Sequence, residues 1–145
     1  MKIAAAKSLI GAVAAWAMAR DDVRALALVG SWARGNPRPI SDIDLLLLSD
    51  RAHEYRRRRK WLSEIDFGGA GYSISSSHGV AYGAVWSRHI HLIPAAEIEL
   101  TFAEPVWART APVDPGTRAL VRDALRIMID KDGSLAKLVR AIAVS

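Results

Sequence analysis

Two aspartates one residue apart, Asp42 and Asp44, stand at the start of a run of four leucines, residues 45–48. Residues i and i+2 of a strand point to the same face, about 6 to 7 Å apart. Two carboxylates held together beside apolar residues repel each other and resist desolvation. A Mg²⁺ ion between them would relieve both costs, because it binds one or two protein carboxylates together with phosphate oxygens. The alternative is a surface pair in which Asp42 caps a turn with Ser41.

A third carboxylate is available in the segment EIELTF, residues 97–102, which alternates polar and apolar residues like a half-buried strand. Glu97, Glu99 and Thr101 share one face of that strand. We prefer Glu99 because it lies deeper in the strand, and Glu97 is the alternative. Both could equally be surface charges on an open sheet face.

The segment before the aspartates places Gly30 and Ser31 directly after a buried strand. Glycine lets the backbone approach a ligand closely. A short helix from Ser31 would aim free N–H groups at a phosphate, with Arg34 one turn further on. We expect Gly30, Ser31, Arg34 and Ser41 to contact a phosphate group. An ordinary turn between a strand and a helix is the alternative.

The composition is that of one globular domain covering residues 1–145, with 51% hydrophobic and 24% charged residues. The absence of cysteine excludes disulfides, zinc–thiolate sites and a cysteine nucleophile, and is compatible with a cytoplasmic protein. The net charge of +5 favours anionic partners such as nucleotides, although a soluble basic protein has the same balance.

Residues 1–19 superficially resemble a secretory signal. However, Lys7 interrupts the apolar region, and apolar residues recur at helical spacing, which favours a core-facing helix. The uninterrupted apolar run is too short to span a bilayer, so we expect no membrane insertion.

The order of the expected elements predicts an α/β or α+β fold, with a mixed central sheet flanked by helices. Helices are expected at residues 3–19, 51–65, 117–125 and 133–143, and strands at 23–30, 41–50, 97–102 and 126–130, with one or two hairpin strands within 68–93. Asp114 or Thr117 could cap the third helix and Ser134 the fourth.

Several other residues could have either a functional role or an ordinary structural one. The basic run at residues 56–60 could bind RNA, but such runs are more often the solvated face of a helix. His89 and His91 alternate on one strand face and could bind metal, although an exposed or satisfied pair is more common. Arg88 could contact a phosphate. Trp32 could stack on a base, or simply pack in the core.

Residues 28–48 resemble the signature of the DNA polymerase beta-type nucleotidyltransferase superfamily, and most closely its small bacterial members, the minimal and the aminoglycoside nucleotidyltransferases. That signature is a hydrophobic residue, Gly-Ser, about ten residues, and then alternating Asp and hydrophobic residues. The positions that match it are Val29, Gly30, Ser31, Asp42, Ile43, Asp44 and Leu45.

The resemblance implies a nucleotidyltransferase fold and a mechanism. Asp42 and Asp44 would bind two Mg²⁺ ions, and Glu99 would bind one of them or act as a base. Gly30 and Ser31 would hold the phosphates of an NTP, for which ATP is the first choice. An acceptor hydroxyl would attack the α-phosphorus, and pyrophosphate would leave.

The acceptor is open: a small molecule, a protein hydroxyl or a tRNA end. A second hypothesis is the antitoxin half of a toxin–antitoxin pair that binds or modifies a partner protein, and a third is a nucleotide sensor without catalysis. Aminoglycoside-modifying relatives typically add a helical domain, and the segment after Phe102 is short for that role. We therefore expect a homodimer or a partner protein to complete the acceptor site.

Overall fold

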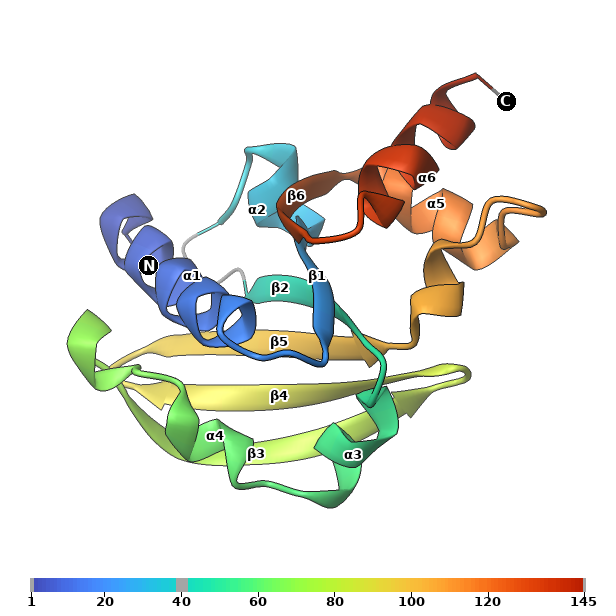
Figure 1. The fold of residues 1–145 in the computed structure, drawn as a ribbon. Coiled ribbons are helices and arrows are strands. Elements are labelled where there is room, and N and C mark those ends of the chain that lie inside the picture. Colours follow the sequence, from blue (N-terminus) through green and yellow to red (C-terminus); the bar gives the residue numbers. More distant parts are fainter. Residues whose placement is uncertain (1, 39–41, 145) are drawn as a thin grey trace.

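The computed structural model describes residues 2–38 and 42–144, and the strands in that part of the chain form one mixed sheet in the order β3-β4-β5-β2-β1-β6 (Figure 1). The strands are β1 (Val23–Val29), β2 (Ile43–Ser49), β3 (Ser73–Tyr82), β4 (Val85–Ile93), β5 (Ala96–Ala103) and β6 (Leu125–Asp130). The helices are α1 (Ile3–Met18), α2 (Gly30–Arg34), α3 (Ala52–Arg57), α4 (Trp61–Glu64), α5 (Pro115–Asp123) and α6 (Ser134–Ala143). Strands β2 and β5 are parallel, and the other neighbours are antiparallel. The predicted mixed sheet flanked by helices is confirmed.

The leucine run is buried because β2 lies in the middle of the sheet and is covered on both faces. Leu45 and Leu47 belong to a core that includes residues of α1, whereas Leu46 and Leu48 belong to a second core that includes residues of α6. A strand buried on both faces carries a continuous apolar run rather than an alternating one.

The second core leaves part of its face of the sheet open. It includes Leu46, Leu48 and Ala103, near the carboxyl ends of β2 and β5. On the same face, towards the amino ends of these two strands, the side chains are the half-buried carboxylates Asp44 and Glu99. The polar residues therefore occupy the half of this face that the second core does not fill.

Helix α1 confirms the predicted helix at residues 3–19. Its buried residues are those whose spacing predicted a core-facing stripe: Ala6, Leu9, Ile10, Val13, Trp16 and Ala17. Within the described residues, neither α1 nor any other helix has the length and apolar character needed to cross a bilayer.

The prediction of one helix over residues 51–65 is wrong. The chain forms two short helices, α3 and α4, because Arg58 adopts an extended conformation between them. This break lets the Trp61 indole turn inward, where its Nε1 donates a hydrogen bond to the Tyr55 carbonyl oxygen at 3.0 Å. Both aromatic rings then pack against Phe102 of β5. Aromatic packing on the sheet therefore outweighs continuation of the helix.

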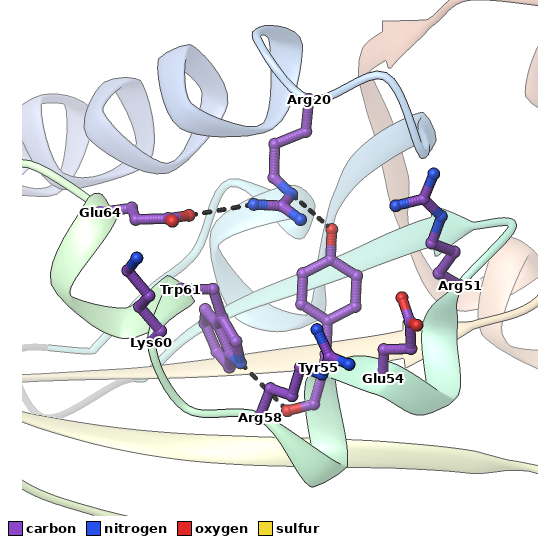
Figure 2. A pocket seen from close by; sticks show the side chains of 8 residues that line it. All are labelled: Arg20, Arg51, Glu54, Tyr55, Arg58, Lys60, Trp61 and Glu64. Carbon is purple, nitrogen blue, oxygen red and sulfur yellow. Dashed lines mark hydrogen bonds and ion pairs between the residues drawn. The ribbon is translucent and has the colours of Figure 1, made fainter.

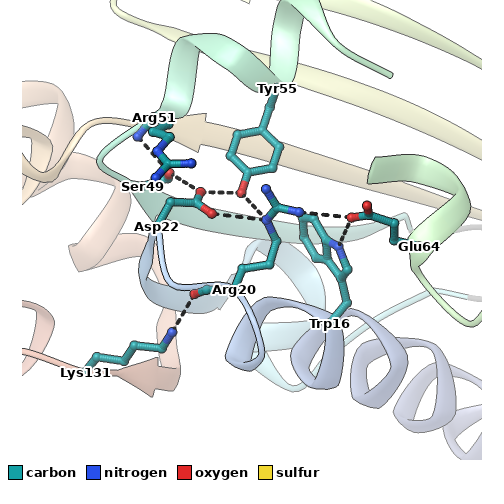
Figure 3. Close-up of polar contacts among 8 residues, drawn as sticks. All are labelled: Trp16, Arg20, Asp22, Ser49, Arg51, Tyr55, Glu64 and Lys131. Carbon is teal, nitrogen blue, oxygen red and sulfur yellow. Dashed lines mark hydrogen bonds and ion pairs between the residues drawn. The ribbon is translucent and has the colours of Figure 1, made fainter. Parts of the chain in front are cut away.

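A buried polar cluster closes the end of the sheet at the carboxyl terminus of β2 (Figure 3). Asp22 accepts hydrogen bonds from Ser49 Oγ at 2.7 Å, from Tyr55 Oη and from Arg20 Nε at 3.2 Å. Arg20 also pairs with Glu64 of α4 at 2.9 Å. These contacts tie the segment after α1 to β2, α3 and α4.

One of the two helix caps predicted near the carboxyl terminus is confirmed and the other is wrong. Asp114 caps α5 as predicted, accepting from the N–H groups of Gly116 and Thr117 at 2.9 and 3.1 Å. The predicted Ser134 cap is wrong. Instead, Asp132 accepts from the Ser134 N–H group at 3.1 Å, and Asp130 at the end of β6 accepts from the next two N–H groups of α6 at 3.0 and 2.9 Å. Two carboxylates that precede the helix thus supply the cap.

Candidate functional site

The sheet register brings carboxylates of two strands side by side. Asp44 of β2 is the direct partner of Glu99 in the parallel strand β5, so their side chains share one face. Burial of Asp44 raises its pKa to about 7, and the negative charges of Glu99 and Asp42 add to this effect. The three predicted acids therefore act on one another electrostatically.

Asp42 lies just before β2 and is half-buried. Its burial, a hydrogen bond with Glu97 and the charge of Glu97 together raise its pKa to about 6, with a smaller contribution from Glu99. Both glutamates of β5 therefore face the aspartate pair, and the choice between them as third carboxylate stays a prediction.

The donor set suits a hard divalent cation. Carboxylate oxygens are the ligands that Mg²⁺ prefers, and crowded acids with raised pKa values are a charge arrangement that a cation would relieve. Among residues 2–38 and 42–144, no group of three acidic or histidine side chains already converges in the manner of a metal site. Binding would therefore require side-chain rotation, including release of Asp42 from Glu97.

The glycine before the site is required by its conformation and by its neighbour. Gly30 has φ +70°, in the left-handed region, and a Cβ atom added there would overlap Asp44 Oδ2. Its neighbour Val29 is the antiparallel partner of Asp44. The turn and the Asp44 side chain thus lie in direct contact. The helix that follows, α2, begins at Gly30 rather than Ser31.

Arg34 lies near the carboxylates but has a partner of its own. Its Nη1 pairs with Asp123 Oδ2 of α5 at 2.6 Å. Its positive charge nevertheless acts on Asp44, where it opposes the rise in pKa. To bind a phosphate, Arg34 would have to exchange this partner. Ser41, the fourth predicted contact, lies outside the described residues.

Asp42, Asp44, Glu97 and Glu99 form an acidic row, and histidines of β4 continue this row on the same face. His89 of β4 pairs in register with Glu99, and its Nε2 is 3.5 Å from Glu99 Oε2. His91 Nδ1 is 2.9 Å from Glu97 Oε1. The strand of the histidines therefore lies beside β5 and not beside β2.

The sequence interpretation missed His78 of β3. Its ring stacks on His89 with the centroids 4.8 Å apart, and its Nδ1 is 3.2 Å from His91 Nε2. The two-residue turn at Gly83 and Ala84 is the signal that could have identified it, because this turn fixes a register in which His78 faces His89.

The basic run at residues 56–60 lies elsewhere. Arg58 and Lys60 line a cavity of about 190 Å³ between the end of α1, α3 and α4 (Figure 2). Arg51, which follows β2, also lines it, so the cavity lies at the opposite end of β2 from Asp44.

Trp32, a candidate for stacking on a base, is partly buried and packs against the first core.

In a comparison with protein-family models, the model described as nucleotidyltransferase domain matches residues 16–109, well over half of the chain. The matched range includes Gly30, both aspartates and β5. The comparison with curated proteins finds no match.

Proposed function

Because the chain belongs to the nucleotidyltransferase domain family, we propose that it transfers a nucleoside monophosphate from an NTP to an acceptor hydroxyl in a Mg²⁺-dependent reaction in the cytoplasm. The observation that carries the proposal is the in-register pairing of Asp44 with Glu99 beside the Gly30 turn. ATP is the first nucleotide to test. Transfer of a nucleoside monophosphate is the activity that the family supports, and the metal, the base and the acceptor are the proposed details.

The carboxylates would have two roles. Asp42, Asp44 and Glu99 would hold the Mg²⁺ ions, which would neutralise the charge that develops on the attacking and leaving oxygens. The half-buried position of these residues favours this role, because charges interact more strongly away from bulk water. Glu99 could also accept the proton of the acceptor hydroxyl, since it lies at the same place on the sheet.

The turn at Gly30 and Ser31 would bind the phosphates. Helix α2 is five residues long, so its dipole is small, and the useful groups are the backbone N–H groups and the Ser31 hydroxyl. In the transfer step, the acceptor oxygen forms a bond to the α-phosphorus while the bond from that phosphorus to the β-phosphate bridging oxygen breaks. The leaving pyrophosphate would lie against this turn, where Arg34 could exchange Asp123 for it.

The test is label transfer from each α-³²P-labelled NTP in turn, with Mg²⁺, into three acceptor pools: small molecules, proteins and tRNA. The wild type should label one pool and release pyrophosphate, and Asp44→Asn should lose both signals. The matched control is Asp50→Asn, since Asp50 follows the same strand and forms an exposed ion pair with Arg24. Full transfer by Asp44→Asn would contradict the catalytic role of that carboxylate.

A further inference from the structure

A buried arginine on the other face of the sheet has no acidic partner. Arg88, in the middle of β4, is only 3% exposed. Side chains alternate along a strand, so Arg88 points away from the face of His89 and the carboxylates. Its Nη1 donates to Ser77 Oγ at 3.1 Å, but its Nε is buried without an acceptor among the described residues. A buried charge without a counter-charge is unfavourable.

The charge that acts on Arg88 is also positive. Burial lowers the pKa of Arg88, and the charge of Arg59, in the link between α3 and α4, lowers it further. Within the described part of the chain, neither guanidinium forms an ion pair with a carboxylate. These residues therefore supply two positive charges and no anion to balance them.

The guanidinium of Arg88 is held in place by its surroundings. It lies 4.9 Å from the centroid of the Trp86 ring, a cation–π contact. The Trp86 ring in turn lies against Gly79 of β3, where an added Cβ would be 2.6 Å from the ring. Glycine at this position thus allows the ring to support the arginine. Of the two strands beside β4, only β3 has no buried residue, so a ligand would have to approach Arg88 from the side of this strand.

We propose that Arg88 and Arg59 bind a phosphate group of a ligand on this face of β3 and β4. A guanidinium forms charge-assisted, often bidentate hydrogen bonds with phosphate oxygens. A phosphate with two negative charges would balance both arginines, and the Ser77 hydroxyl lies beside Arg88 as a further donor. The site requires neither an NTP nor the acidic row, so it is independent of the proposed transfer activity.

The test is NMR of the arginine Nε–H groups of ¹⁵N-labelled full-length protein, without nucleotide or Mg²⁺. Sodium phosphate is titrated against sodium chloride at constant ionic strength. Phosphate should shift the Arg88 resonance to saturation, whereas chloride should leave it in place. Arg88→Met assigns this resonance by its disappearance. If phosphate and chloride shift the resonance equally, the proposal is wrong.

The second arm compares two variants of the same basic run. Arg59→Gln should weaken phosphate binding by about tenfold, the loss expected for one charge-assisted contact. Arg57→Gln removes an equal charge from an exposed position of α3 and should leave binding unchanged. Equal weakening in both would show general charge attraction and overturn the site. Neither residue lies in the core, so this arm does not depend on the folding of Arg88→Met.

The third arm identifies the source of the phosphate. An oligouridine that shifts the Arg88 resonance at lower phosphate concentration than inorganic phosphate would identify a nucleic acid backbone as the ligand. A shift by inorganic phosphate alone would identify a small phosphate compound. Arg34→Gln, which removes a charge near the acidic row, should leave both results unchanged, and a loss of the shift in that variant would place phosphate at the other site.

Discussion

Asp44→Asn should stabilise the metal-free protein at alkaline pH while it removes transfer activity. In the folded state, burial and then the charges of Glu99 and Asp42 raise the pKa of Asp44 from the ordinary 3.8 to about 7. Because this folded-state pKa is raised, the folded protein binds the proton more tightly than the unfolded chain does. The free energy of unfolding therefore falls as the pH rises from about 4 to about 7.

The magnitude follows from the two pKa values. The difference between the Asp44 pKa values of 3.8 and about 7 corresponds to about 4 kcal/mol, at about 1.36 kcal/mol for each unit of pKa. Asp44 is half-buried, so solvent screening reduces this figure, and we expect about 2 kcal/mol. Asparagine has nearly the same shape and no charge. At pH 8 it should therefore raise the free energy of unfolding by about 2 kcal/mol, and at pH 5 by less than about 1 kcal/mol.

The assay is urea unfolding followed by tryptophan fluorescence, with a chelator present, at pH 8 and pH 5. Asp50→Asn is the control: its ion pair with Arg24 is exposed to solvent and should make the same small contribution to the free energy of unfolding at both pH values. The reasoning is refuted if Asp44→Asn is no more stable than the wild type at pH 8, or if its advantage is the same at pH 5.

Three further predictions concern the metal, the turn and the buried polar cluster. Mg²⁺ should raise the melting temperature of the wild type at pH 8 by its binding to the folded state, and should have a much smaller effect on Asp44→Asn. Gly30→Ala should lower the free energy of unfolding by about 1–2 kcal/mol from the positive φ alone and reduce transfer, because the new Cβ displaces Asp44; urea unfolding and the label assay measure the two effects. Tyr55→Phe removes the hydrogen bond to Asp22 and should cost about 1–3 kcal/mol in urea unfolding at pH 7. Burial raises the pKa of Asp22, but its hydrogen bonds and the charge of Arg20 outweigh burial, so the folded-state pKa lies below the ordinary value. The stabilisation by ionised Asp22 is therefore present above about pH 4 and is lost as the pH falls through the lower folded-state pKa. The cost of Tyr55→Phe should shrink in that acid range.

The buried strand could be predicted because strand periodicity is local. Asp42 lies just before β2 and not within it, so a face shared by Asp42 and Asp44 stays a prediction. The meeting of Asp44 with Glu99 depends on which strands are neighbours and in which register, and no local pattern fixes this. The break at Arg58 also escaped prediction, because it depends on where Trp61 packs and not on helix propensity.

The sequence did not predict which of Arg88 and His89 lies on the face of the carboxylates, and the reason is physical. Arg88 and His89 are adjacent in sequence, and both are reasonable phosphate contacts by type. Alternation along the strand sends them to opposite faces, and only the register with β5 shows that His89 joins the acidic row. Which side of a strand a polar residue occupies was therefore decided by tertiary contacts.

The distribution of charge also argues for a metal in the proposed reaction. The net charge of +5 can attract an NTP from a distance. Close to Asp44, however, the surface carries several carboxylates on one face of two strands. A triphosphate would meet repulsion there, which Arg34 alone opposes only in part. Long-range attraction and local repulsion are reconciled if the nucleotide arrives as a complex with a divalent cation, so nucleotide binding in chelator should be weak in spite of the basic composition of the chain.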